Sequence, residues 1–335
     1  MNSANETLSE RPLLQIRDLR TWFPIRRGIF SRTVGNVRAV DGVSLDVGQG
    51  ETVGLVGESG CGKTTLARTV LRLEAAHSGS IVFEGQDLLA IRERDLRRLR
   101  QRLQVVFQDP YSSLNPRMTV VDIVTEGLVE HGLIHARRRR EAAISLLADV
   151  GMDKDALHRH PHEFSGGQRQ RISIARAVSL KPRLVICDEP VSALDVSVQA
   201  QVLNLLADLR EEHGLAYLLI SHDLSVVRRM AARTAVMYLG QIVEHGPTEL
   251  IMARPRHPYT RALIAAVPRI GRPPGQRTAP AGDVPSPANP PPGCRFHPRC
   301  PFAVDACRTT VPELESAQGE ESTGRVVSCL RRDEI

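Results

Sequence analysis

The chain has 335 residues, a length that allows one large domain with an extension or two domains. It is 41% hydrophobic and 24% charged, which is an ordinary soluble composition. The sequence holds no run of about 18 apolar residues, so we expect no membrane-spanning segment. The polar residues 1–10 lack the basic and apolar regions of a signal peptide. These features predict a cytoplasmic location.

The net charge of +6 comes almost entirely from arginine, because the only lysines are Lys63, Lys154 and Lys181. Arginines cluster at residues 92–102 and 137–140. Such a cluster can form a patch for nucleic acid or anionic lipid, or it can be the solvated face of a helix. We expect solvated helix faces here, and no nucleic-acid partner.

Apolar runs and period-two alternation predict strands at 14–16, 39–45, 52–56, 80–85, 104–107, 184–187 and 217–220. The sequence predicts helices at 64–73, within 109–165 and at 198–212. The runs at 184–187 and 217–220 are apolar throughout, as strands buried on both faces are. This order of elements predicts an α/β fold with a mostly parallel sheet covered by helices.

A glycine-rich segment follows the predicted strand 52–56 and precedes the predicted helix 64–73. It matches the phosphate-loop pattern G-x-x-x-x-G-K-T and reads Gly57-Glu58-Ser59-Gly60-Cys61-Gly62-Lys63-Thr64-Thr65. Glycines let backbone N–H groups approach phosphate oxygens, and the helix dipole favours the same anion. We expect Lys63 to reach the β- and γ-phosphates of a nucleotide and the Thr64 hydroxyl to bind Mg²⁺.

Two acidic residues, Asp188 and Glu189, directly follow the predicted strand 184–187. Asp188 can hold Mg²⁺ directly or through water, and Glu189 can polarise the attacking water. Gln108 and His222 also follow predicted strands, but neither residue type is informative by itself. What makes Gln108 and His222 candidate site residues is their position along the chain relative to the phosphate loop.

A further glycine turn, Ser165-Gly166-Gly167-Gln168, stands shortly before Asp188 and forms a second possible anion cradle at a helix start. Ser192-Ala193-Leu194-Asp195 follows it. With the phosphate loop, Gln108, the Asp188-Glu189 pair and His222, six motifs occur in one order. In this arrangement the chain resembles the ATPase subunit of an ABC transporter. Phe164 stands where the family signature most often has Leu.

The resemblance implies roles for residues that the sequence alone leaves open. In the family, Gln108 touches Mg²⁺ or the attacking water, and His222 contacts the γ-phosphate. The Ser165 turn closes over ATP on the partner's phosphate loop, so two nucleotides lie between two subunits, and Asp195 lies in the segment that crosses this interface. An aromatic residue stacks on adenine, for which Phe23 is the better match and Trp22 the alternative.

The resemblance also implies a P-loop NTPase core with an antiparallel β subdomain. We expect the catalytic core at 1–108 and 166–255, and a helical subdomain at 109–165 with the signature motif at its end. Residues 256–293 form a predicted linker, with nine prolines between Pro268 and Gly293. Residues 294–335 form a Cys-rich C-terminal extension.

Three segments resemble the oligopeptide/dipeptide importers within that family, and in particular their second ATPase subunit. They lie at residues 23–30, 108–116 and 257–263, the last reading His257-Pro258-Tyr259-Thr260-Arg261-Ala262-Leu263. The resemblance implies two permease subunits, an extracytoplasmic substrate-binding protein and a second ATPase subunit, which we expect to be a different chain. It implies a peripheral location on the cytoplasmic face of the cell membrane. Importers of nickel and other solutes share this branch.

Four cysteines cluster in the extension: Cys294, Cys300, Cys307 and Cys329. Clustered thiols in a cytosolic protein favour a metal over disulfides, although the spacing differs from that of zinc ribbons. Zn²⁺, an iron–sulfur cluster and free or disulfide-forming thiols stay open, and His297 could replace one Cys at zinc. Some relatives with such an extension carry a [4Fe–4S] cluster there, which is the site we expect. Its role would be structural, because the extension has little apolar surface for a core.

Two other classes of function are compatible with an ABC-type ATPase core. One is a soluble ATPase that acts on DNA or ribosomes. DNA-repair relatives insert a long coiled coil, whereas about 100 residues separate Lys63 from Ser165 here, and ribosome-acting relatives carry two cores. The other is a non-hydrolysing nucleotide sensor, which Glu189 and His222 argue against. We therefore favour an ATPase that powers peptide import.

Overall fold

The computed structural model describes residues 11–28, 30–266 and 282–335. The chain divides into two structural units. Unit 1 comprises Met1–Leu13, Val47–Thr52 and Ala90–Ile220, and unit 2 comprises Leu14–Asp46, Val53–Leu89 and Ser221–Ile335. Part of the expected proline-rich linker, residues 267–281, lies outside the described residues.

Unit 1 combines three parallel strands with helices. The strands lie in the order β6-β7-β8 and span Leu103–Val106, Leu184–Asp188 and Ala216–Ser221. The α-helices are α3 (Glu93–Arg100), α4 (Pro110–Ser113), α5 (Val120–Glu130), α6 (Arg139–Asp149), α7 (Gly166–Val178) and α8 (Val196–His213). The 3₁₀ turns are η1 (Ala136–Arg138), η2 (Lys154–Ala156) and η3 (Pro161–Glu163). The predicted strands and the long helix before β8 are therefore confirmed, with ends that differ by a few residues.

The parallel register explains which residues meet where the strands end. Val106 of β6 lies beside Cys187 of β7, and Asp188 lies beside Ile220 of β8. Every residue of β7 and β8 is buried, as their continuous apolar sequences predict. Because the strands run in one direction, the residues that follow them emerge at the same edge.

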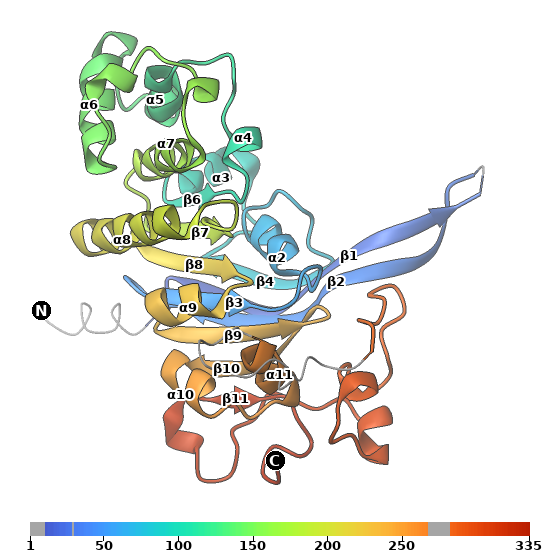
Figure 1. Ribbon diagram of the computed structural model, residues 1–335. Coiled ribbons are helices and arrows are strands. Elements are labelled where there is room, and N and C mark those ends of the chain that lie inside the picture. Colours follow the sequence, from blue (N-terminus) through green and yellow to red (C-terminus); the bar gives the residue numbers. More distant parts are fainter. Residues whose placement is uncertain (1–10, 29, 267–281) are drawn as a thin grey trace, which may run out of the picture. The chain divides into compact units, whose positions relative to one another are not determined.

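The segment 109–165 contains helices and 3₁₀ turns, and α5, α6 and α7 lie together within unit 1 (Figure 1). Apolar residues on α5 and α6 face inward, among them Ile123, Val124 and Leu147. Within the part of the chain that the structure describes, no helix has the length and apolarity needed to cross a membrane.

Unit 2 contains an antiparallel sheet and a mixed group of strands. The antiparallel sheet has the order β2-β1-β4-β5, with β1 at Leu14–Arg27, β2 at Arg32–Val47, β4 at Ser78–Phe83 and β5 at Gln86–Asp87. The mixed group comprises β3 (Thr52–Val56), β9 (Arg233–Tyr238), β10 (Gln241–Pro247) and β11 (Val326–Val327). Strand β3 pairs with β9 in parallel, while β9–β10 and β10–β11 are antiparallel. Its helices and turns are α2 (Lys63–Val70), α9 (Leu224–Met230), α10 (Thr248–Ala253), α11 (Pro258–Ala266), η4 (His297–Arg299), η5 (Asp305–Arg308) and η6 (Glu321–Thr323).

The C-terminal region shares the core of unit 2. Helix α11 occupies part of the segment that the sequence predicted as a linker, and it buries Tyr259. Strand β11 extends the strand group beside β10 (Figure 1). The ring of Phe296 is 1% exposed and contacts the rings of Tyr238 and Tyr259. Phe296 and Val327 of the extension are therefore buried against the core of unit 2, whereas Phe302, Val304, Val311 and Leu314 remain exposed.

We predict that Phe296→Ala lowers the free energy of unfolding by about 3–5 kcal/mol, because it removes a fully buried ring between two aromatic neighbours. Urea unfolding of the full chain measures the change. The matched control is Phe302→Ala, whose ring is 37% exposed and should cost less than half as much. Equal losses in the two variants would contradict the burial argument.

Candidate functional site

The phosphate loop connects β3 to α2, and its backbone passes close to two other strands. A Cβ atom on Gly57 would lie 2.2 Å from the carbonyl oxygen of Met237, and one on Gly62 would lie 2.0 Å from that of Ala39. Gly62 has a φ of 109°, in the left-handed region that side chains disfavour. Glycine is therefore required at both positions, as the phosphate-loop pattern predicts.

Lys63 begins α2 and points back into the loop. Its ammonium donates hydrogen bonds to the carbonyl oxygens of Gly57 at 2.8 Å and Glu58 at 3.0 Å. The side chain is 4% exposed. Burial raises the pKa of the neighbouring Cys61 thiol, so Cys61 is a neutral neighbour of the lysine at physiological pH. The loop thus concentrates one positive charge at the start of a helix, where a phosphate group binds favourably.

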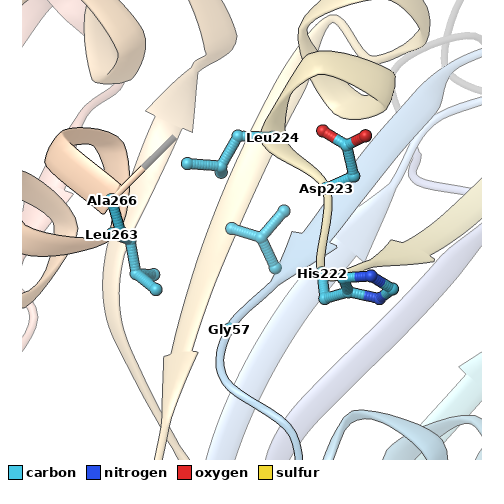
Figure 2. A pocket seen from close by; sticks show the side chains of 7 residues that line it. Gly57, His222, Asp223, Leu224, Leu263 and Ala266 are labelled. Atoms are coloured by element: carbon cyan, nitrogen blue, oxygen red, sulfur yellow. The ribbon is translucent and has the colours of Figure 1, made fainter. Parts of the chain in front are cut away.

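A cavity of about 330 Å³ lies beside the loop in unit 2. Gly57 and His222 line it, together with Val56, Asp223, Leu224, Leu263 and Ala266. Figure 2 shows the exposed His222 on the segment between β8 and α9, near the Gly57 backbone. Asp223 caps α9 by accepting a hydrogen bond from the Ser225 N–H. The structure therefore places His222 and the first glycine of the phosphate loop around one cavity.

Glu189 and Gln108 meet in unit 1. The amide Nε2 of Gln108 donates to the Glu189 carboxylate at 3.0 Å. Register explains this contact, because each residue lies two positions beyond a paired residue, Val106 or Cys187. Asp188, the last residue of β7, is 4% exposed. Burial raises the pKa of Cys187 to about 12, so this thiol stays protonated within the strand.

The backbone of Glu189 is held in a sparsely populated conformation. Its φ is 49°, which is rare for a residue with a side chain. The Glu189 N–H donates to the carbonyl of Ile220 at 2.9 Å, and its own carbonyl accepts from the Ser192 hydroxyl at 3.1 Å. These contacts aim the carboxylate at the strand edge where Gln108 lies.

The signature segment starts α7. Ser165 is the N-cap and forms a capping box with Gln168, whose side chain accepts from the Ser165 N–H at 3.0 Å. A Cβ on Gly167 would lie 2.4 Å from Cγ1 of Val198, whereas one on Gly166 would meet Leu194 at 3.4 Å. Phe164 is buried beneath the Arg159 guanidinium, so an apolar residue suits this position as Leu would.

Other predicted site residues lie on edges and surfaces. Asp195 is the exposed N-cap of α8, and the next residue, Val196, is 82% exposed. In unit 2, the Trp22 ring stacks on His77 at 4.2 Å, and the Arg38 guanidinium lies 5.1 Å from its centre. Phe23 is the next residue on β1 and is half-buried.

The four cysteines of the extension line one cavity in unit 2, with His297 and Phe296 among its other walls. Burial raises the pKa of Cys294 to about 11, and the three other thiols contribute to the rise. As placed, however, these side chains do not form a ligand set. Among the described residues, no three His, Cys, Asp or Glu side chains are arranged to hold a metal ion. The four cysteines therefore share one cavity, while the geometry lends no support to a bound metal or cluster.

The structure adds three residues from the C-terminal region that the sequence did not predict as part of the site. The Tyr259 hydroxyl accepts from the Glu58 N–H at 2.8 Å, and the Arg299 guanidinium forms two hydrogen bonds with the Glu58 carboxylate. Arg295 pairs with Asp41, which also accepts from the Trp22 indole. Two sequence features could have pointed to these residues: the His-Pro-Tyr segment at 257–259 and the arginine that precedes Cys300.

Two family models match the chain. The model described as "ABC transporter" matches residues 40–192, and the model "Oligopeptide/dipeptide transporter, C-terminal region" matches residues 243–307. Similar proteins match over nearly the whole length. The "Oligopeptide transport ATP-binding protein AppF" of Bacillus subtilis is 50% identical over 95% of this chain and 96% of its own. The chain belongs to the ABC transporter family, in its oligopeptide/dipeptide branch.

Other members of this branch match to a similar extent. The "Dipeptide transport ATP-binding protein DppF" of Haemophilus influenzae is 45% identical over 98% of this chain and 99% of its own. A "Probable peptide ABC transporter ATP-binding protein" of Sinorhizobium fredii is 53% identical over 95% of this chain and 89% of its own. As a member of this family, the chain is an ABC ATPase, and its ATP motifs agree with that activity.

Solved structures support the fold. A dimeric ATP-binding cassette in a post-hydrolysis state, bound to ADP and phosphate, has a TM-score of 0.63 and 24% identity, and the match covers 70% of this chain and 98% of that one. The cassette cbiO1 of Clostridium perfringens has a TM-score of 0.62 and 24% identity, and the match covers 73% of this chain and 92% of that one. The predicted P-loop ATPase fold is therefore confirmed.

We predict that Gly167→Ala lowers the thermal unfolding midpoint by roughly 4 °C or more, because the new methyl group would overlap Val198. The matched control is Gly166→Ala, whose methyl group would make an ordinary contact and should cost much less. The double variant Gly167→Ala with Val198→Ala should regain part of the loss, since it removes the obstructing methyl. No difference between the two glycine variants would contradict the close approach.

Proposed function

We propose that this chain is the ATP-hydrolysing subunit of an ABC importer that takes up oligopeptides or dipeptides. The observation that carries the proposal is a complete phosphate loop and an oriented Glu189 in a chain that matches peptide-transport ATP-binding proteins over 95% of its length. The match at residues 243–307 to the oligopeptide/dipeptide C-terminal region favours peptides over nickel or another solute.

The roles that we propose for the site residues follow their chemistry. Lys63 and the loop N–H groups bind the phosphates, while Thr64, Asp188 and Gln108 hold Mg²⁺. Glu189 orients and deprotonates the attacking water, and His222 contacts the γ-phosphate. The Gln108–Glu189 hydrogen bond supports this assignment, because it keeps the carboxylate in one orientation before the water arrives. For adenine we favour Phe23, since His77 and Arg38 already contact the Trp22 ring.

We also propose that two ATPase subunits share each nucleotide. Ser165 and Asp195 are exposed, as is the apolar side chain of Val196, which follows Asp195, so all three are accessible to a partner subunit. Ser165, Gly166, Gly167 and Gln168 would close over ATP on the partner's phosphate loop. We expect the partner to be a second, different ATPase chain.

The segment 109–165 would face two permease subunits, which receive peptide from an extracytoplasmic substrate-binding protein. Tyr111 supports this orientation, because it lies three residues after Gln108, is exposed, and stacks on the guanidinium of Arg169 near the start of α7. A residue placed there can transmit a change at the water-binding glutamine to a neighbouring chain. The chain would lie peripherally on the cytoplasmic face of the cell membrane.

We predict that Glu189→Gln lowers kcat for ATP hydrolysis by about 10²–10⁴-fold in the complete complex, because the amide keeps the shape of the side chain and loses the base. Nucleotide binding should persist, and the ATP-bound ATPase pair should accumulate, as measured by light scattering. The control Glu211→Gln changes an exposed acid on α8 and should leave turnover unchanged. Wild-type turnover in Glu189→Gln would overturn the catalytic assignment.

Purification of the intact complex tests the remaining proposals. Subunit identification by mass spectrometry should give this chain, a second ATPase chain and two permease chains. A photo-cross-linker at Ser113 should capture a permease. Cross-links to ribosomal protein or DNA would favour a soluble ATPase, and bound nickel in the substrate-binding protein would replace peptide as the solute.

For the extension, we propose that Cys294, Cys300, Cys307 and Cys329 bind one [4Fe–4S] cluster, with Zn²⁺ as the alternative. The support is that all four thiols line one cavity. Binding requires the thiols to move into a ligand geometry that they do not have here and to lose their protons. The role would be structural, because ATP hydrolysis involves no redox step.

We predict that chain purified without oxygen is brown, absorbs broadly near about 400 nm and contains about four irons. Cys→Ser at any of the four positions should remove the colour and increase proteolysis of residues 282–335. The control Cys61→Ser lies in the phosphate loop and should retain the iron. Colourless protein with one zinc per chain would contradict the proposed cluster but support a metal site at the four cysteines. Metal-free protein would contradict both proposals.

A further inference from the structure

The backbone N–H, the carbonyl and the carboxylate of Glu58, the second residue of the phosphate loop, each form hydrogen bonds within unit 2. Its carbonyl accepts from the Lys63 ammonium at 3.0 Å, and its N–H donates to the Tyr259 hydroxyl at 2.8 Å. Its carboxylate accepts from both terminal nitrogens of Arg299, at 2.9 and 3.2 Å. One loop residue therefore connects the phosphate-binding lysine to two residues of the C-terminal region.

The two C-terminal residues are themselves fixed. The Arg299 side chain is only 6% exposed, and its guanidinium lies 5.9 Å from the Tyr238 ring centre and 6.0 Å from that of Phe296. The Tyr259 ring is fully buried, 4.6 Å from Tyr238 and 5.5 Å from Phe296. A two-pronged arginine–carboxylate pair restrains orientation as well as distance, unlike an exposed ion pair.

We propose that Arg299 and Tyr259 are positioning residues for the phosphate loop, and that through Glu58 they set the affinity of this subunit for ATP. The proposal rests on ATP binding at the phosphate loop and goes beyond it, because both residues lie in the oligopeptide/dipeptide C-terminal region at 243–307, outside the matched ABC segment at 40–192.

The physical reason is preorganisation. A phosphate loop must hold several N–H groups toward one anion, and ordering a free loop costs part of the binding free energy. Arg299 and Tyr259 fix the position of Glu58, and the Glu58 carbonyl in turn helps to place Lys63. Release of Glu58 should weaken ground-state binding of ATP, while the hydrolytic groups Gln108 and Glu189 keep their own contact.

The test is a double-mutant cycle with Arg299→Gln and Glu58→Gln in the full chain. Each variant should raise the Kd of a fluorescent MgATP analogue, and the KM for ATP in the complete complex, by roughly 5- to 30-fold, with kcat within about twofold. The Kd of the double variant should not exceed that of the weaker-binding single variant, because both substitutions remove the same contact. Arg299→Lys should restore part of the affinity, and Tyr259→Phe should weaken binding while keeping the ring packing.

The matched control is Arg308→Gln, which removes an exposed arginine of the same extension, paired with Asp305 at 3.8 Å, and should leave Kd unchanged. Wild-type affinity in Glu58→Gln would overturn the proposal even if Arg299→Gln fails to fold. Strictly additive losses, or a loss of kcat with unchanged KM, would also overturn it. Absence of MgATP binding by the wild-type chain would instead contradict the ATPase assignment itself.

Discussion

The phosphate loop passes its neighbouring strands at distances that leave no room for side chains. At Gly57 and Gly62, a Cβ would lie 2.2 and 2.0 Å from the carbonyl oxygens of Met237 and Ala39. Both carbonyls belong to strands, β9 and β2, so neither can move aside without breaking a ladder of hydrogen bonds. The close approach therefore fixes the path of the loop, the start of α2 and the direction of Lys63.

The C-terminal region of unit 2 builds on this fixed loop. Tyr238, at the end of β9, is the common neighbour of Tyr259 from α11 and Phe296 from the extension. The three rings bring Arg299 to Glu58. A solved cassette of the same fold covers 70% of this chain, and the oligopeptide/dipeptide C-terminal region matches residues 243–307. In this protein the branch-specific C-terminal region is thus integrated with the nucleotide loop.

In unit 1 a strained backbone fixes the position of the Glu189 carboxylate, for which we propose the catalytic role. Glu189 adopts a left-handed φ that costs free energy, and bonds to Ile220 and Ser192 hold it there. Gln108 then orients the carboxylate from the neighbouring strand. The hydrogen bonds that hold this strained conformation keep the Glu189 carboxylate in one position at the carboxyl edge of the parallel strands.

Much of the core could be predicted from local sequence. Continuous apolar runs at 184–187 and 217–220 gave buried parallel strands, and the glycines of the phosphate loop gave a turn with close backbone contacts. Gln108 and Glu189 were each predicted at strand ends. Their hydrogen bond needed the register of β6 on β7, which neither sequence segment encodes alone.

The C-terminal region shows what the local sequence could not determine. The proline-rich pattern suggested a linker from residue 256, whereas α11 forms at 258–266 because Tyr259 packs into an aromatic core built from distant segments. Arg299 and Glu58 are 241 residues apart in sequence. The sequence by itself determined the ATPase core, since periodicity and glycine patterns act over a few residues. Only the tertiary structure decided which distant side chains hold the loop, because an ion pair depends on where packing places both partners.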